Sequence, residues 1–226
     1  MTNLRRPIVL AIVAAAAVTA AAQSPPTCAE LGTAMRNVSS NRIGDSTSIY
    51  NCSFDRQMVT QKCSVTTTLA TGQKLQQYTT QIWGSVADLV DQYKINPPLN
   101  YSLKLLTAGE GALRETTYTY DDRRRVVRED NVSAAAKMTL TWSEWDANGR
   151  PTKGKWTGEP APSVDTDTVT YDDAGRKMHR VTTGAGGVTS DIEFDAAGMG
   201  IKVTSQTTIG KMVSTMTVTA TQKICK

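Results

Sequence analysis

The sequence predicts a mainly β fold, an antiparallel β-meander or curved sheet of tandem hairpins, with one short helix near residues 86–94. Two observations carry this prediction. A turn motif, in which an aromatic residue and Asp are followed by Gly and Arg, recurs with its aromatic residue at positions 120, 145, 171 and 194. The segments between these motifs are rich in Thr, Val and aromatic residues, and each has room for two strands. Consecutive strands joined by tight turns need no crossover helix, so the sheet should be antiparallel.

The recurring motif has the composition of a β-hairpin tip. An Asp side chain can accept hydrogen bonds from backbone groups two residues further on, and Gly can take the positive φ of a tight turn. The best copy is at residues 170–176, the copy at 120–125 lacks the Gly, and the copy at 194–199 lacks the Arg. The predicted turn residues are Tyr120, Asp121, Trp145, Asp146, Gly149, Arg150, Tyr171, Asp172, Gly175, Arg176, Phe194, Asp195 and Gly198.

The first 22 residues have the features of an export signal peptide. Arg5 and Arg6 precede an apolar segment at 8–18, and cleavage is expected after Ala22. The apolar segment is shorter than the roughly 20 residues that a spanning helix needs. The strands also lack the continuous apolar face of an outer-membrane barrel. The sequence therefore predicts a secreted or periplasmic protein without stable membrane insertion.

The charge of the chain gives no reason to expect a nucleic-acid partner. Removal of Arg5 and Arg6 lowers the net charge from +4 to +2, and both signs are spread along the chain. The one basic cluster, at residues 123–128, is flanked by acidic residues and is typical of a solvated hairpin tip.

Four cysteines remain after cleavage, and an even number in an oxidising compartment predicts two disulfides. Three pairings are possible. We favour Cys52–Cys63, which would close a local hairpin, and Cys28–Cys225, which would join the two ends of the mature chain. Zinc is a competing use of four cysteines, but the sequence has no Cys-x-x-Cys pair and one histidine, His179. We expect no metal and no cofactor.

The region 23–96 should hold the disulfide-containing strands and the helix. Residues 28–38 favour a short helix by composition, and 39–48 have the Ser, Asn, Asp and Gly content of a loop. Strands are predicted at 48–54, 62–69 and 76–83. Ser85 and Asp88 resemble a capping box, which predicts that a helix begins at residue 86. Pro97 and Pro98 mark the best domain boundary, although the region 97–226 should continue the preceding sheet.

In the region 97–226, strands are predicted at 101–106, 113–120, 137–145, 150–156, 166–171, 176–183, 188–194, 200–207 and 211–225. Their apolar residues alternate with polar ones, so that Val169 and Tyr171 share one face of the sheet. One strand does not fit, because Trp142 falls on the face opposite Trp145. A β-bulge near Glu144 would bring both rings to the same face.

The hairpins centred on Tyr171 and Trp145 resemble the YD repeats of Rhs and teneurin-type proteins, whose units share an aromatic residue, Asp, Gly and Arg around a turn. The resemblance covers roughly residues 113–207. In that family, long arrays of such hairpins wind into a shell that encloses cargo. Four copies are too few to enclose cargo, so the resemblance implies a curved β-sheet that serves in surface recognition.

Two patterns in the sequence are also found in enzymes. Gly44-Asp45-Ser46 resembles the nucleophile block of secreted GDSL-type lipases and esterases. Those enzymes need a histidine that follows an Asp by three residues, whereas His179 follows Arg176 at that spacing. The second pattern is a set of paired carboxylates, which suggests a glycosidase or a calcium site.

These carboxylates are Asp165 with Asp167 and Asp172 with Asp173. Both pairs are predicted to lie at turns, where Asp is favoured for its local hydrogen bonds to the backbone. The turn role explains them without chemistry, and we expect no catalytic residues.

Trp142, Trp145 and Trp156 are the candidate binding residues, because an exposed aromatic ring on a sheet can stack on a sugar. The sequence therefore suggests an exported, non-catalytic binding or structural module that recognises a glycan or an envelope protein. A lipocalin-like β-barrel with an apolar ligand is the first alternative, and a secreted hydrolase is the second. A closed barrel would be distinguished from an open sheet by a pocket lined from alternate strand positions.

Overall fold

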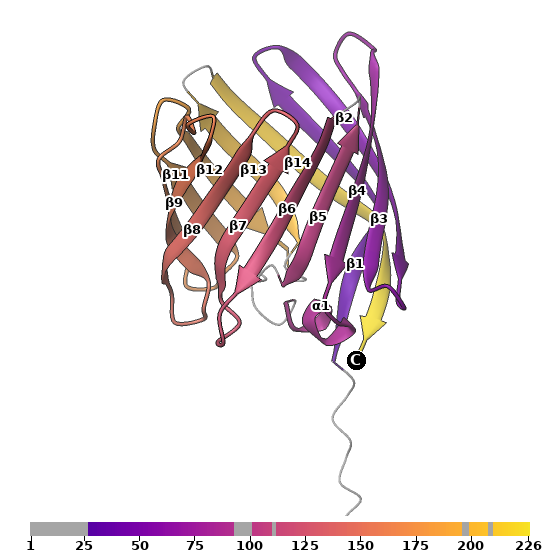
Figure 1. Ribbon diagram of the computed structural model, residues 1–226. Helices are drawn as coiled ribbons and strands as arrows, with labels where there is room; N and C mark the ends of the chain where they lie inside the picture. Colours follow the sequence, from indigo (N-terminus) through magenta and orange to yellow (C-terminus); the bar gives the residue numbers. More distant parts are fainter. Residues whose placement is uncertain (1–26, 93–100, 110–111, 196–198, 208–209) are drawn as a thin grey trace, which may run out of the picture.

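The computed structural model describes residues 27–92, 101–109, 112–195, 199–207 and 210–226. Within these ranges the chain forms fourteen strands and one helix, and the strands close into a single antiparallel barrel (Figure 1). Each strand pairs with its neighbours in the sequence, and the first strand pairs with the last. The expected signal peptide at 1–22 and the Pro97-Pro98 boundary lie outside the described residues.

The strands are β1 (Cys28–Asn41), β2 (Gly44–Asp55), β3 (Thr60–Thr68), β4 (Lys74–Trp83), β5 (Ser102–Gly109), β6 (Ala112–Tyr120), β7 (Val126–Ser133), β8 (Lys137–Trp145), β9 (Pro151–Glu159), β10 (Thr166–Tyr171), β11 (Lys177–Thr182), β12 (Val188–Phe194), β13 (Gly200–Thr207) and β14 (Gly210–Cys225). The predicted antiparallel meander of hairpins is confirmed, and it closes into a barrel rather than remaining an open sheet. Strands from both predicted regions, 23–96 and 97–226, belong to this barrel. The strand β7 is an addition to the predicted set.

The predicted short helix is present as α1 (Val86–Gln92). Its N-terminus has the predicted cap, since Ser85 Oγ accepts a hydrogen bond from the backbone N–H of Asp88 at 3.0 Å. The Ser85 hydroxyl also donates to Asp88 Oδ2 at 2.8 Å. A short acidic side chain thus performs the role that Glu usually has in a capping box. The helix lies at one end of the barrel, beside the C-terminus, and we call this the lower end (Figure 1).

The helix predicted at 28–38 and the loop predicted at 39–48 are wrong, because strands occupy most of both segments. β1 pairs with β14 on one side and with β2 on the other, and a two-residue turn separates β1 from β2. Asn41 Oδ1 closes this turn by accepting the N–H of Ile43 at 2.8 Å and that of Gly44 at 3.2 Å. Helix propensity is a weak preference, and pairing on both edges of β1 outweighs it. A register shift between Gly32 and Met35 accommodates the least strand-like residues.

The two faces of the barrel wall differ in polarity. Leu140 and Asp167 are fully buried, and side chains that share their face of the sheet point into the barrel. The opposite face carries Thr residues and cross-strand ion pairs such as Lys153 with Glu144 at 3.0 Å. Val169 and Tyr171 share a face as predicted, and that face points inward. The predicted bulge is also present, since the β8–β9 register shifts on both sides of Glu144.

Two apolar clusters fill part of the interior. The first surrounds α1 and joins Leu31, Trp83, Leu89, Val90 and Ile224 with Ala29. The second is built by strands β6–β11 around Leu140, Trp142 and Val169. Eight strands make a barrel that side chains alone can fill, and fourteen enclose more space. The helix at one end and the large aromatic residues on the wall therefore fill interior space that the strands alone would leave open.

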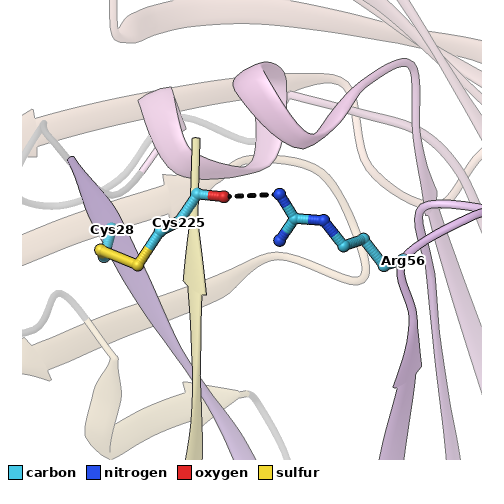
Figure 2. The surroundings of a disulfide bond; sticks show 3 residues. All are labelled: Cys28, Arg56 and Cys225. Carbon is cyan, nitrogen blue, oxygen red and sulfur yellow. Dashed lines mark hydrogen bonds between the residues drawn. A yellow bond between two sulfur atoms is a disulfide. The ribbon is translucent and has the colours of Figure 1, made fainter. Parts of the chain in front are cut away.

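Both predicted disulfides are confirmed. Cys28–Cys225 joins β1 to β14 at the lower end, and Cys52–Cys63 joins β2 to β3. Figure 2 shows that the Arg56 guanidinium donates a hydrogen bond of 2.9 Å to the carbonyl oxygen of Cys225, so a side chain from the neighbouring hairpin holds the end of the chain. Two disulfides indicate an oxidising compartment. No helix in the described ranges is long and apolar enough to span a lipid bilayer.

Candidate functional site

The predicted hairpin turns at 120–125, 145–150 and 171–176 all lie at the lower end of the barrel. Asp146 shows why Asp is needed there: its Oδ1 accepts the N–H groups of Asn148 at 2.9 Å and Arg150 at 2.8 Å. Its Oδ2 accepts Arg150 Nε at 2.6 Å. Gly149 has the expected positive φ of 78°. In the copy without Gly, Arg124 takes this conformation with a φ of 61°.

The aromatic residue of each turn reaches back to the preceding hairpin. Tyr120 Oη donates to the carbonyl oxygen of Ser102 at 2.7 Å, and Tyr171 Oη donates to that of Pro151 at 3.1 Å. Trp145 Nε1 makes the corresponding bond to the carbonyl oxygen of Val126 at 3.0 Å. The turns are therefore connected laterally, and not only through strand pairing.

The arginine of each turn completes this connection. Arg125 lies over the ring of Trp145 with its Cζ 4.3 Å from the ring centroid, and Arg150 lies over Tyr171 at 4.1 Å. Cation–π stacking of this kind covers one face of each ring. Burial raises the pKa of Tyr171 to about 12, and Arg150 acts in the opposite direction. We call this series of alternating arginines and aromatic rings the ladder.

The fourth copy of the motif departs from the ladder. Asp195 Oδ1 accepts the N–H of Met199 at 2.9 Å, so its turn is closed in the same way. Phe194 has no hydroxyl or indole N–H with which to bond the preceding hairpin. Arg176 is exposed and, among the described residues, stacks on no ring. Gly198 lies outside the described residues. The ladder thus links three hairpins.

The basic cluster at 123–128 is not simply a solvated tip. Arg124 lies over the ring of Tyr101 at 4.5 Å and pairs with Asp88 at 2.5 Å and Asp91 at 3.4 Å. Because both carboxylates belong to α1, this arginine ties the first turn of the ladder to the helix that closes the lower end.

The three candidate tryptophans have different environments. Trp142 is only 5% exposed, and its Nε1 donates to Glu129 Oε1 at 2.8 Å. Its ring needs the glycine opposite, because a Cβ on Gly154 would lie 2.9 Å from Trp142 Cε3. Trp145 belongs to the ladder. Trp156 is partly exposed and lines a cavity in the barrel interior. Only Trp156, of these three, is available to a ligand in the lumen.

Asp167 was predicted to lie at a turn, and this prediction is wrong. It points inward from β10 and is 0% exposed. The Arg180 guanidinium binds both of its oxygens, with Nε at 2.8 Å from Oδ1, and Nη2 forms a second short bond to Oδ2. Trp156 Nε1 also donates to Asp167 Oδ2 at 3.4 Å. The buried carboxylate therefore holds the N–H edge of the partly exposed indole ring.

The second interior carboxylate belongs to Glu129 on β7. Burial raises the pKa of the Glu129 carboxyl, although the hydrogen bond from Trp142 acts in the opposite direction. Each interior carboxylate thus holds the N–H of one tryptophan. Neither Glu129 nor Arg180 was predicted from the sequence. The sequence did not indicate which residues of their strands point inward. The bulge at Glu144 also shifts the register between β8 and β9, so alternation along the chain does not carry the inner face across it.

Two adjoining cavities lie beneath the upper mouth of the barrel. The first, of about 230 Å³, is lined by Arg114, Asn131, Val132, Ser133, Ala136, Met138 and Trp156. The second, of about 420 Å³, is lined by Gln77, Thr107, Gly109, Ala112, Leu113, Arg114, Ser133, Ala134 and Ala135. They share Arg114 and Ser133, so they adjoin each other and together form a recess that extends from β4 to β9. We call it the upper recess.

The polar groups of the upper recess are partly fixed by the wall. The Thr116 hydroxyl donates to Asn131 Oδ1 at 2.8 Å, and among the described residues the amide nitrogen of Asn131 has no acceptor. Gly109 allows close packing, since a Cβ there would lie 2.7 Å from Gln77 Cγ. The recess therefore combines a partly exposed indole ring with amide, hydroxyl and guanidinium groups on a rigid wall.

The residues of the esterase hypothesis lie on opposite faces of the wall. His179 points outward, and its Nδ1 lies 2.7 Å from Asp191 Oδ1 on the neighbouring strand. Ser46 lies opposite Ser39, and the Ser39 hydroxyl contacts Ser214 inside the barrel. The hydroxyl and the imidazole are thus separated by the sheet, and the structure does not bring them together.

The comparisons with protein families and with curated proteins identify no related protein. No protein-family model matches the chain, and no curated protein is similar to it in sequence.

Proposed function

We propose that the mature chain is an exported, non-catalytic binding barrel that holds a saccharide in the upper recess. The observation that carries this proposal is the partly exposed ring of Trp156, which a hydrogen bond to Asp167 holds beside a cavity that also presents the polar side chains of Asn131 and Ser133. Binding sites of this kind combine an apolar surface with a few well-placed polar groups.

A sugar ring matches both parts of this lining. Its C–H face can pack on the indole ring, and its hydroxyls can bond the amide of Asn131 and the hydroxyls of Ser133 and Thr107. An apolar ligand, as in the lipocalin-like alternative, would leave these groups without water or a partner. Each buried polar group left unsatisfied costs about 1–3 kcal/mol. The lining of the recess therefore favours a polar ligand.

The interior carboxylates support a binding role rather than hydrolysis. Asp167 is occupied by Arg180 and Trp156, and Glu129 accepts the indole N–H of Trp142. Both carboxylates position aromatic rings, so the interior acidic groups already have structural roles. This arrangement supports a site that is built to hold a ligand.

The ladder supports the resemblance to YD repeats. In successive hairpins the Asp carboxylate accepts the backbone N–H of the arginine that ends the turn, and that arginine lies over the next aromatic ring. We propose that these hairpins are a short array of YD-type units. Their role here would be to stiffen the part of the wall that carries Trp156, and not to enclose cargo.

The proposal is tested by titrating the purified chain 23–226 with glucose, galactose and their short oligosaccharides, using tryptophan fluorescence and calorimetry. Binding should be lost in Trp156→Ala and kept in Tyr78→Ala, which removes a 58% exposed aromatic ring from the outer face of β4. Circular dichroism would verify that both variants fold. Equal binding by the two variants, or no binding of any sugar by the wild type, would sink the proposal.

A further inference from the structure

Among the residues that the structure describes, one cation of the upper recess, Arg114, has no counter-ion. Arg114 points inward from β6, where it lies opposite Thr107 on β5 and Ser133 on β7. In the part of the chain that the structure describes, its guanidinium forms no ion pair. The other inward-facing arginine, Arg180, is neutralised by Asp167. The recess is therefore a place where one positive charge is left for a ligand.

The position of Arg114 places this charge where a ligand in the recess can contact it. It lines both cavities of the upper recess, so its guanidinium borders the space next to Trp156 and the space next to Gln77. It is exposed to this space, so a ligand can reach it. A guanidinium presents several N–H donors in one plane and binds a carboxylate or sulfate through two parallel hydrogen bonds.

From this geometry we infer that the saccharide bound in the upper recess is acidic, with its ring on Trp156 and its carboxylate or sulfate on Arg114. The inference rests on the proposed function and adds the chemical class of the ligand. Neutral groups of the recess, such as Asn131, bind the ring hydroxyls and do not distinguish acidic from neutral sugars. Arg114 supplies that distinction.

The test compares glucuronate, glucose 6-sulfate and glucose as ligands of the mature chain, by calorimetry at low and high ionic strength. A charge-assisted bidentate contact should make the acidic sugars bind about tenfold or more tightly than glucose. Added salt should reduce this preference, because it screens an exposed charge. Preference for glucuronate alone would identify a carboxylate as the bound group, and preference for glucose 6-sulfate alone would identify a sulfate.

Two variants separate this inference from the proposed function. Arg114→Gln should abolish the preference for acidic sugars, measured as the affinity for glucuronate and the affinity for glucose 6-sulfate, each relative to glucose. Lys155→Gln removes one positive charge from the outward-facing neighbour of Trp156 and should change neither value. If Arg114→Gln binds acidic sugars as the wild type does, or if the wild type binds all three sugars equally, the inference is overturned while saccharide binding stands. If the wild type binds none of them, the proposed function fails as well.

Discussion

The two sides of the barrel are held together by different chemistry. The ladder side, β6–β11, uses large aromatic rings stacked with arginines and an apolar cluster around Leu140. The seam side, β13, β14 and β1–β5, uses two disulfides, the helix α1 and pairs of small hydroxyl side chains such as Ser48 with Thr67 at 2.8 Å. On the ladder side, aromatic rings hold neighbouring hairpins together. On the seam side, where the chain ends meet, disulfides and a helix have this role.

This difference has a physical cause. Strands on the ladder side are joined by short connections to both neighbours, so closing each hairpin costs little chain entropy. The pair of β1 with β14 brings together segments that are almost two hundred residues apart. That contact has a large entropic cost of closure, and a disulfide reduces the cost by restricting the unfolded chain.

The largest expected effect is on the seam. Replacement of Cys28 and Cys225 by serine should lower the free energy of unfolding by about 5 kcal/mol, because the disulfide spans 197 residues. The same change at Cys52 and Cys63, which are 11 residues apart, should cost about 3 kcal/mol. Urea denaturation of the two double variants measures both values. Equal losses of unfolding free energy in the two double variants would show that chain entropy does not explain how the disulfides stabilise the seam side.

The next effect is inside the ladder side. Asp167→Ala should cost about 3–5 kcal/mol, since it leaves the partly buried Arg180 charge without its partner. Asp165→Ala removes an exposed carboxylate two residues away and should change stability by no more than about 0.5 kcal/mol. Thermal and urea unfolding of both variants would measure the difference. A small loss in Asp167→Ala would mean that Arg180 finds another partner or moves into water.

A smaller effect is expected in the ladder itself. Arg150→Ala should cost about 1–2 kcal/mol, because it removes both the stack on Tyr171 and the ion pair with Asp146 from a residue that is 7% exposed. Arg176→Ala is the matched control, since Arg176 has the same place in the next turn and stacks on no described ring. Similar losses from the two variants would contradict a stabilising role for the ladder.

The smallest effect is a pH dependence at Glu129. Its pKa is raised in the folded protein, so the folded state binds more protons than the unfolded state above the ordinary pKa of Glu. Stability from this group is fully present below that ordinary value and is lost as the pH rises through the folded pKa. Glu129→Gln keeps the acceptor for Trp142 and should be more stable than the wild type at neutral pH and equal to it in acid. Urea unfolding from pH 4 to pH 8 would test this, and a constant difference across that range would argue against it.

Much of the fold could be predicted from local patterns. The turn at 145–150 is determined by Asp146 and Gly149, whose hydrogen bonds and backbone conformation involve only neighbouring residues. Several strand ends and the cap of α1 were predicted for the same reason. The wrong prediction of a helix at 28–38 has a non-local cause. β1 forms a strand because it pairs with β14, and no local sequence pattern indicates a partner so distant in the sequence.

The candidate site was less predictable. Trp156 was among the candidate residues, but its ring is presented to the lumen rather than to an outer sheet face. The frequency of Asp in turns predicts a turn position for Asp167, whereas Arg180 on the next strand makes its burial possible. Arg114 and Asn131 carry no local signal, since their importance comes from an inward position beside a cavity.

The sequence by itself determined the hairpins and the capped helix, and it left three possible pairings of the four cysteines, of which the structure has the favoured one. These features depend on turn chemistry, periodicity and composition, which act over a few residues. Only the tertiary structure decided that the sheet closes, which face is inside, and that Trp156 and Arg114 border one recess. Closure depends on the β1–β14 pair, and once it forms, every side chain that alternates to the inner face is brought into a shared interior.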